Sequence, residues 1–290
     1  MEEMKSIADV IKKISHSGEE NKNINNNFDF TQFQIDKYNK AKIQSDVYQC
    51  DKCGNKGIIA LKGDNDKIVY KQCSCYKIRL NRKRMKDLGL LDFVVSNDSD
   101  SNINNTNIQK EEWEIKCEEK INDYCNNNSN GFWFFIGGAV GSGKTTKCSK
   151  IISNMINKNL NLLADYINWD TSYKDIINCE RDFNKLSLKS DIVEHYKNVD
   201  ILYIDDFLRH KNPEQLKNDE RDLAKCIIDY RYRNKKITLI SSELYYQEIE
   251  EMDEAIASRI YQMCDKGKYL LNIKRDKNRN YRKKKDLGVL

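Results

Sequence analysis

The segment from Gly138 to Thr145 has the residue types and spacing of a phosphate-binding loop. It follows the pattern G-x-x-x-x-G-K-T, in which glycines let the backbone approach phosphates and backbone N–H groups point at the anion. The pattern predicts that Lys144 reaches the β- and γ-phosphates of ATP and that the Thr145 hydroxyl binds Mg²⁺. The nucleotide-binding residues that it predicts are Gly138, Gly141, Ser142, Gly143, Lys144, Thr145 and Thr146.

The flanking sequence supports this interpretation. An apolar, aromatic run, Phe132–Ile136, precedes the loop and is typical of a buried strand, and Lys147–Lys158 has a helical pattern. Strand, glycine loop and helix are the context that a nucleotide-binding motif requires. The alternative is a chance glycine-rich turn before a helix, and the flanking elements disfavour it.

A second candidate for nucleotide chemistry is the apolar run Ile201–Ile204, which ends in two carboxylates. After a phosphate-binding loop this is the Walker B position, where Asp205 would hold the Mg²⁺ shell, usually through water. Asp206 would orient or deprotonate the attacking water. Paired acids at a strand end also serve as turns or helix caps, but the preceding loop favours the catalytic role.

Two further polar positions follow. The run Ile237–Ile240 leads into Ser241, Ser242 and Glu243, where a strand end can probe the γ-phosphate; the alternative is a polar turn. Arg259 lies among small residues on a helical pattern and could stabilise transition-state charge on the nucleotide of a neighbouring subunit. The alternative is a surface arginine.

Four cysteines near the amino terminus have metal-ligand spacing. Cys50-x2-Cys53 is followed after 19 residues by Cys73-x-Cys75, and the pairs flank a hairpin-like segment, Lys56–Lys71. Thiolates in this arrangement fit tetrahedral structural Zn²⁺. Gly54 suits a knuckle in which backbone N–H groups approach the thiolates. Free buried thiols are the alternative.

Apolar segments alternate with helical patterns beyond residue 130. The strand candidates are Phe132–Ile136, Leu162–Ile167, Ile201–Ile204, Ile237–Ile240 and Tyr269–Ile273. Helical patterns include Phe33–Ile43, Glu111–Tyr124 and Glu214–Arg233 after Pro213. The alternation predicts an α/β fold, a P-loop NTPase with a parallel five-stranded sheet and helices on both faces. We expect a small zinc module with a basic helix in 1–95, a Ser/Asn/Asp-rich linker in 96–110, and the NTPase domain with a basic tail in 111–290.

Charge and composition limit the partners. The net charge of the chain is +5, but residues 266–290 carry ten Lys/Arg and two Asp, so that the tail holds +8. A weakly acidic body with a basic tail indicates an electrostatic contact confined to the tail, not a nucleic-acid-binding protein that is basic throughout. No run approaches 18 apolar residues, and ten cysteines without a secretory signal favour a reducing cytosol. The sequence therefore predicts a cytoplasmic protein with no membrane partner.

Two basic segments could bind single-stranded DNA. Lys77–Lys86 holds six Lys/Arg on a helical pattern, and Arg279–Lys285 lies in the tail, with Tyr269 or Tyr281 available to stack on a base. The alternative is a solvated charged face.

Four sequence features together resemble the AAA+ ATPases of the DnaC/DnaI helicase-loader group, phage-type loaders above all. They are Phe134-Phe135-Ile136-Gly137-Gly138 before the loop, Tyr203-Ile204-Asp205-Asp206-Phe207, Tyr230-Arg231-Tyr232-Arg233-Asn234 before Ile240-Ser241-Ser242-Glu243, and Ser258-Arg259-Ile260. The resemblance implies an AAA+ core with a reduced or absent lid. It implies nucleotide and Mg²⁺ binding by Lys144 and Thr145, a catalytic Walker B pair at Asp205 and Asp206, and an arginine finger at Arg259.

The same resemblance implies the partners: a hexameric replicative DNA helicase contacted by the zinc module, single-stranded DNA, and self-association through the ATPase domain. Two departures stand out, since Asp206 replaces the glutamate common in AAA+ proteins and Glu243 replaces an asparagine. The leading prediction is an ATP-dependent helicase loader. Its alternatives are an IstB-like transposition helper ATPase, a nucleotide-gated adaptor with little turnover, and a P-loop metabolic kinase. A kinase would need lid arginines over the phosphates, and none stands out in this sequence.

Overall fold

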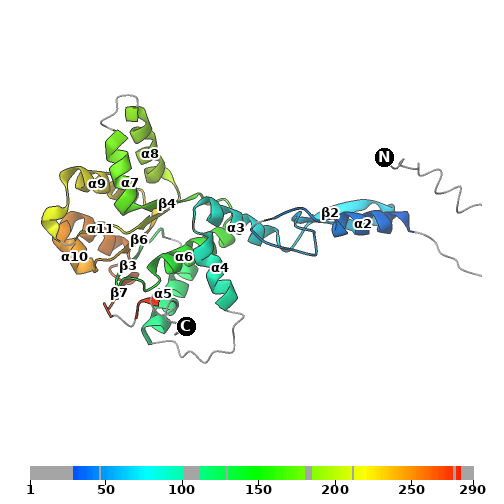
Figure 1. Ribbon diagram of the computed structural model, residues 1–290, viewed down its shortest axis with the longest axis horizontal. Coiled ribbons are helices and arrows are strands. Elements are labelled where there is room, and N and C mark those ends of the chain that lie inside the picture. The colour runs from blue at the N-terminus through cyan, green and yellow to red at the C-terminus, as the bar shows by residue number, and fades with distance from the viewer. Residues whose placement is uncertain are drawn as a thin grey trace, which may run out of the picture.

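A computed structural model of the chain describes residues 29–45, 47–100, 112–128, 130–179, 185–210, 212–276 and 279–281 (Figure 1). In the sequence, apolar residues have helical spacing at 4–14 and asparagines are frequent at 21–27, and both stretches lie outside the described residues. Figure 1 shows an α/β body from which the cysteine module projects as an elongated arm. None of the helices described is long and apolar enough to cross a membrane.

The body is built on a five-stranded sheet, whose strand order is β4-β5-β6-β3-β7. The strands are β3 (Phe134–Gly138), β4 (Ala164–Asn168), β5 (Ile201–Asp205), β6 (Ile237–Ser242) and β7 (Leu270–Ile273). Neighbouring strands pair in parallel throughout. The predicted parallel five-stranded sheet is confirmed, and all five strands end at the same edge.

Helices cover both faces of the sheet. On one face α6 (Lys144–Lys158) packs against α5 (Glu112–Asn127), α3 (Tyr76–Asp87) and α4 (Leu91–Asp100). On the other face α9 (Asn218–Arg233) packs against α7 (Trp169–Asn178), α8 (Leu186–Asn198) and α11 (Glu254–Met263), which adjoins α10 (Tyr246–Met252). Burial on both sides explains why β3 and β5 are fully buried and why their sequences read as continuous apolar runs.

The arm consists of α2 (Phe30–Lys40) and a hairpin of β1 (Ile58–Lys62) and β2 (Ile68–Gln72) joined through η1 (Asp64–Asp66). The predicted hairpin is confirmed. Asn39 on α2 exchanges two 2.9 Å hydrogen bonds with the backbone of Ala60, so that the helix lies along one face of the hairpin.

The junction between arm and body differs from the predicted boundaries. Met85 on α3 and the following Leu90 are fully buried in the same core as the sheet, so α3 belongs with the body by its packing. Helix α4 continues to Asp100, past Ser96, and the predicted linker is therefore wrong for 96–100. Residues 101–110 of that linker lie outside the described part of the chain.

A buried polar contact fastens α3 to α6. Asn81 is 3% exposed and donates to the Ser153 carbonyl at 2.8 Å, while the Ser153 hydroxyl donates back to Asn81 Oδ1 at 2.9 Å. Because both side-chain groups are satisfied, the pair fixes the register of the two helices without leaving an unpaired polar atom.

Arg231 on α9 is fully buried and holds the connection that leads from α8 into β5. Its guanidinium donates to the carbonyls of Tyr196 and Val199, each at 2.8 Å, and to the Thr238 hydroxyl at 2.9 Å. Burial lowers the pKa of Arg231 to about 9. Carbonyls at a helix end and the start of a neighbouring strand thus receive their hydrogen bonds from one side chain.

We expect Arg231→Met to reduce the free energy of unfolding by about 3–5 kcal/mol, because several buried carbonyls lose their donor at once. Urea denaturation of the purified protein measures the change. Arg233→Met is the matched control, since Arg233 is exposed on the last turn of the same helix. Equal losses in the two variants would contradict the role assigned to Arg231.

Candidate nucleotide-binding site

The phosphate-binding loop lies where β3 ends and α6 begins. Gly138 and Gly141 have φ angles of 102° and 72°, which favour glycine. A Cβ at Gly138 would collide with the Ile273 carbonyl at the end of β7, and one at Gly141 with the Asn280 side chain. The loop is thus closely packed on its outer side, and only glycine fits at these two positions.

Lys144 is the first residue of α6 and is 8% exposed. Its ammonium donates to the carbonyls of Gly138 at 3.0 Å and Ala139 at 2.7 Å. Gly143 precedes it at the N-cap, where no side chain among the described residues caps the helix. Backbone N–H groups of the first turn, which includes Thr145 and Thr146, therefore remain available for an anion. The predicted loop, lysine and helix start are brought together by the structure.

Asp205 joins this loop to the end of β5. The Thr145 hydroxyl donates to Asp205 Oδ2 at 3.0 Å, and the Ser241 hydroxyl donates to Oδ1. Tyr166 on β4 also donates to Oδ2 at 3.5 Å. A hydroxyl and a carboxylate side by side are hard oxygen donors that suit Mg²⁺. The predicted Mg²⁺ ligands Thr145 and Asp205 are therefore adjacent, and a bound ion there would neutralise phosphate charge.

Asp206 follows in a left-handed conformation, with φ of 53°, that turns its carboxylate away from the strand. Asn168, at the end of β4, donates to Asp206 Oδ2 at 3.4 Å. Burial, and next the charge of Asp205, raise the pKa of Asp206 above its usual value. A carboxylate with a raised pKa accepts a proton more readily, which suits the general-base role predicted for it.

Arg209 is a charged side chain at this site that the sequence analysis missed. Its Nε lies 2.9 Å from Glu243 Oε2, and its Nη1 lies 3.9 Å from Asp206 Oδ2. Glu243, expected either to probe phosphate or to sit in a turn, is thus tied by an ion pair to the loop that follows Asp205 and Asp206. The position of Arg209 three residues after Asp206 is the only signal in the sequence, and it does not reveal the partner.

Arg259 lies on α11, and its described contacts are with α9 and its own helix, not with the phosphate-binding loop. Its Nε is 2.7 Å from Asp229 Oδ1, and its Nη1 donates to the Ala255 carbonyl at 2.7 Å. The Tyr232 ring lies 5.9 Å from the guanidinium. The role of Arg259 toward a neighbouring subunit stays a prediction, and in the isolated chain Asp229 holds the side chain.

The carboxy-terminal segment 279–281 crosses the outer side of the loop. The Tyr281 N–H donates to the Gly141 carbonyl at 3.0 Å. The Lys147 ammonium lies beside two neighbouring rings, 5.3 Å from that of Trp113 and 6.0 Å from that of Tyr281. Tyr281, proposed from the sequence to stack on a DNA base, is thus part of a cluster beside α6. The rest of the basic tail, 282–290, lies outside the described residues.

The four predicted zinc ligands converge in the arm. The Sγ atoms of Cys50, Cys53, Cys73 and Cys75 all lie within 4.8 Å of one another. The Sγ of Cys50 is 3.9 Å from that of Cys73, and the Sγ of Cys53 is 3.4 Å from that of Cys75. Sulfurs bound tetrahedrally at ~2.3 Å from zinc would lie ~3.8 Å apart, so this arrangement fits Zn²⁺. A four-thiolate site of this kind has a structural and not a catalytic role.

Backbone geometry around the cysteines supports thiolate binding, although not as the sequence predicted. The N–H that reaches a thiol is that of Gly57, 3.3 Å from Cys53 Sγ, whereas Gly54 leaves room for the Ala41 carbonyl. Burial alone would raise the pKa of Cys53, but the hydrogen bonds from the Gly57 N–H and the neighbouring thiols together outweigh it. The pKa of Cys53 is therefore lowered, to about 7. The buried Asn55 side chain, which the sequence analysis missed, accepts from the Cys50 N–H at 2.7 Å.

The basic helix α3 uses its arginines partly for structure. Arg79 donates to the Tyr48 carbonyl at 3.3 Å, and the Arg82 guanidinium lies 5.0 Å from the centre of the Tyr48 ring. Arg84 donates to the Leu162 carbonyl in the body at 3.5 Å. These side chains tie the arm to the body, and the predicted contact of this helix with DNA remains untested.

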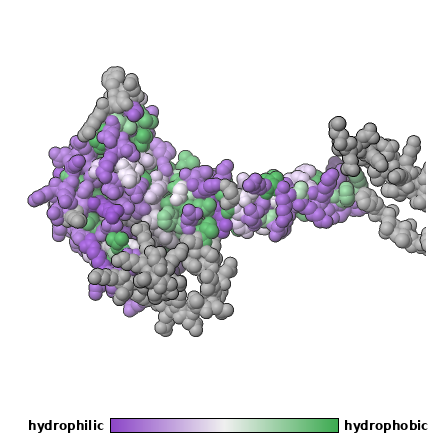
Figure 2. Space-filling model, in the orientation of Figure 1, coloured by the Kyte–Doolittle hydropathy of each residue, from purple (hydrophilic) through white to green (hydrophobic). Residues whose placement is uncertain are grey.

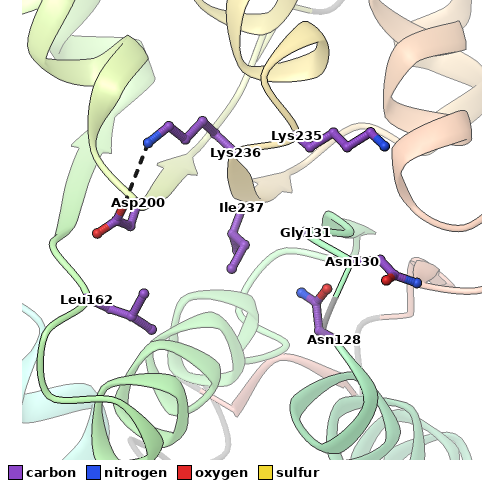
Figure 3. Close-up of a pocket in the computed structure, with 8 residues that line it drawn as sticks. All are labelled: Asn128, Asn130, Gly131, Leu162, Asp200, Lys235, Lys236 and Ile237. Atoms are coloured by element: carbon purple, nitrogen blue, oxygen red, sulfur yellow. Dashed lines mark ion pairs between the residues drawn. The ribbon is translucent and has the colours of Figure 1, made fainter.

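A pocket of about 510 Å³ lies at the opposite edge of the sheet (Figure 3). Its walls include Lys236, which is 3.5 Å from Asp200, and Ile237 at the start of β6. Figure 3 shows these side chains around an open hollow between the strand starts and neighbouring helices. Since phosphates bind at the carboxyl ends of parallel strands, this pocket is not the nucleotide site.

Comparison with known proteins places the chain in a family. Residues 110–264 match the model of the bacterial DnaA ATPase domain. Two relatives come from Bacillus subtilis strain 168: the phage-like element PBSX protein XkdC is 27% identical over 81% of this chain and 85% of its own length. The uncharacterised protein YqaM is 34% identical over 48% of this chain, a match that spans only 42% of YqaM.

Among solved structures, the DnaC helicase loader matches with a TM-score of 0.48 and 17% identity, over 59% of this chain and 95% of that one. The family match spans more than half of the described chain, covers the phosphate-binding loop, both acids and Arg259, and is consistent with the predicted resemblance to DnaC/DnaI-type loaders. This protein is a member of the bacterial DnaA ATPase-domain family, with the AAA+ P-loop fold that its sequence predicts.

Proposed function

We propose that the protein is an ATP-dependent loader of the replicative DNA helicase in phage or bacterial replication, acting in the cytoplasm. The observation that carries the ATP-dependent part is the contact between the phosphate-binding loop and the acids of β5, the 3.0 Å hydrogen bond from Thr145 to Asp205. Lys144, which precedes Thr145, supplies a phosphate ligand, and Asp206, which follows Asp205, supplies a base. Together they provide each group that hydrolysis of a Mg²⁺-bound nucleotide requires.

In this proposal each side chain has a separate task. Lys144 would exchange its loop carbonyls for the β- and γ-phosphates, and Thr145 and Asp205 would hold Mg²⁺, which would neutralise phosphate charge. Asp206, held by Asn168, accepts the proton of the attacking water. Hydrolysis then removes the γ-phosphate and changes the contacts at the ends of β5 and β6.

The arm supports the proposed helicase contact. It exposes large apolar side chains, and Figure 2 shows apolar patches among hydrophilic residues along it. The exposed apolar residues of the arm are Phe30, Phe33, Ile43, Ile58, Leu61, Val69 and Tyr70. Several exposed apolar residues on a small projecting module favour a protein-binding role for it. For single-stranded DNA we propose the basic segment Arg279–Lys285, whose described residues, 279–281, lie beside the phosphate-binding loop.

The test is reconstitution with the hexameric replicative helicase of the host. We expect the full-length protein to form a stoichiometric complex with the helicase and to place it on closed circular single-stranded DNA only when ATP is present. A protein that stimulates a transposase on double-stranded DNA and ignores the helicase would instead fit an IstB-like helper. Loading without measurable hydrolysis would fit a nucleotide-gated adaptor.

We expect Arg259→Ala to lower ATP turnover about 10³-fold at high protein concentration, because a trans arginine stabilises transition-state charge. Turnover of the wild type should rise with protein concentration, and that dependence should vanish in the variant. Arg233→Ala is the control, since Arg233 is an exposed arginine on α9. Unchanged turnover in Arg259→Ala would reject the proposed finger. In Asp229→Asn, Arg259 loses its ion pair. Turnover should therefore reach its maximum at a lower protein concentration than in the wild type.

A further inference from the structure

The loop after β5 is fixed in a conformation that costs backbone strain. Asp206 and Leu208 have φ angles of 53° and 48°, unusual for residues other than glycine. The Phe207 N–H donates to the Ser241 carbonyl at 2.9 Å, and the Ser242 hydroxyl donates to the Phe207 carbonyl at 2.7 Å. Because Phe207 and Leu208 are fully buried, the turn is anchored to β6 and the next residue has a defined direction.

That next residue is Arg209, and the turn directs it back toward the catalytic acids. Glu243 holds its Nε at 2.9 Å, and Asp206 Oδ2 lies 3.9 Å from its Nη1. Among the described residues these are the charged partners of the guanidinium. An arginine has five N–H donors, so one edge can stay on Glu243 while others bind an anion.

A nucleotide bound at the start of α6 would direct its terminal phosphate toward the residues that would hold Mg²⁺, Thr145 and Asp205. Asp206 follows Asp205 directly in the chain, and its Oδ2 lies 3.9 Å from Nη1 of Arg209. Arg209 is therefore the cation beside these acids. The carboxylates of Asp205, Asp206 and Glu243 would otherwise repel a terminal phosphate, and a nearby cation offsets that repulsion.

We propose that Arg209, held in position by Glu243, binds the γ-phosphate of ATP in the same chain that binds the nucleotide. The proposal rests on the ATP site assigned above and concerns how that site distinguishes ATP from ADP. The side chain of Arg209 is 46% exposed, and an exposed ion pair contributes little to the stability of the fold. Arg209 is suited to phosphate by its geometry, because two N–H groups of the planar guanidinium match two phosphate oxygens. The ion pair with Glu243 keeps the guanidinium directed toward the site.

The experiment measures the equilibrium affinity of the full-length protein for Mg²⁺–AMPPCP and for Mg²⁺–ADP by calorimetry. Arg209→Ala should weaken AMPPCP binding about 10- to 100-fold and change ADP binding less than about 2-fold. Arg209→Lys should recover part of the preference, because a lysine keeps the charge but not the fork. Glu243→Gln should give an intermediate loss, and Arg233→Ala should give none.

The outcomes separate this proposal from the function on which it rests. Wild type that binds neither nucleotide would overturn both. Wild type that binds both, with an Arg209→Ala variant that retains the ratio of the two affinities, would overturn only the role of Arg209. Melting curves of each variant confirm that the folded protein is compared, and a loss confined to AMPPCP is not produced by misfolding.

Discussion

Replacing Lys144 by alanine is expected to abolish ATP binding, with an affinity at least roughly 100-fold weaker than that of the wild type. The lysine is almost fully buried against the loop carbonyls and is positioned to exchange them for two phosphates. Hydrogen bonds to charged groups contribute about 1.5–3 kcal/mol each, so that the loss of two exceeds a factor of 100. Calorimetric titration with Mg²⁺–ATP measures the effect.

Lys150→Ala is the matched control, because Lys150 lies on the same helix, away from the loop, in the groove beside Asn154. Its affinity for ATP should equal that of the wild type. Retained ATP binding in Lys144→Ala would mean that the loop does not bind the triphosphate. Asp205→Asn offers a second check, since it should preserve folding but remove the Mg²⁺-dependent part of turnover.

The second large effect is expected from Cys73→Ser, which should release one zinc ion per chain and unfold the arm. The arm has little apolar core, since its buried cluster consists of three cysteines with a few partly buried neighbours. Structural zinc contributes about 10–16 kcal/mol in small zinc-finger peptides, more than such a module can replace by packing. Metal analysis measures the zinc, and limited proteolysis should show cleavage within 41–75.

ATP binding by the body should survive in this variant, because the sheet has its own core. Cys226→Ser is the control, since Cys226 is exposed on α9, far along the chain from the cluster. No zinc in the wild type, or full protease resistance after chelation, would contradict the metal assignment. Loss of helicase binding in Cys73→Ser with normal ATP binding would connect the arm to the proposed partner.

The residues of the proposed ATP site that lie within continuous segments of the chain were predictable from the sequence. The loop from Gly138 to Thr145 and the pair after β5 are continuous segments, and their flanking apolar runs fix the edge at which they meet. Because parallel strands end together, the contact between Thr145 and Asp205 follows from the alternation of strands and helices.

Contacts between distant segments were not predictable in the same way. The ion pairs of Arg209 with Glu243 and of Arg259 with Asp229 join residues about 30 positions apart, and a surface arginine gives no sign of its partner. The arginines of α3 were expected on a solvated or DNA-binding face, yet three of them reach backbone carbonyls across the junction. The length of α4 was missed because its Ser- and Asp-rich end has the composition of a loop.

The hydrogen bonds between Asn81 and Ser153 give α6 a mechanical role. Its first residue, Lys144, would meet the phosphates, and Ser153, ~14 Å further along at 1.5 Å per residue, is bonded to Asn81 on α3. Because α6 connects the phosphate-binding loop to α3, we expect a movement of its first turn to be transmitted to the helix that directly follows the cysteine module.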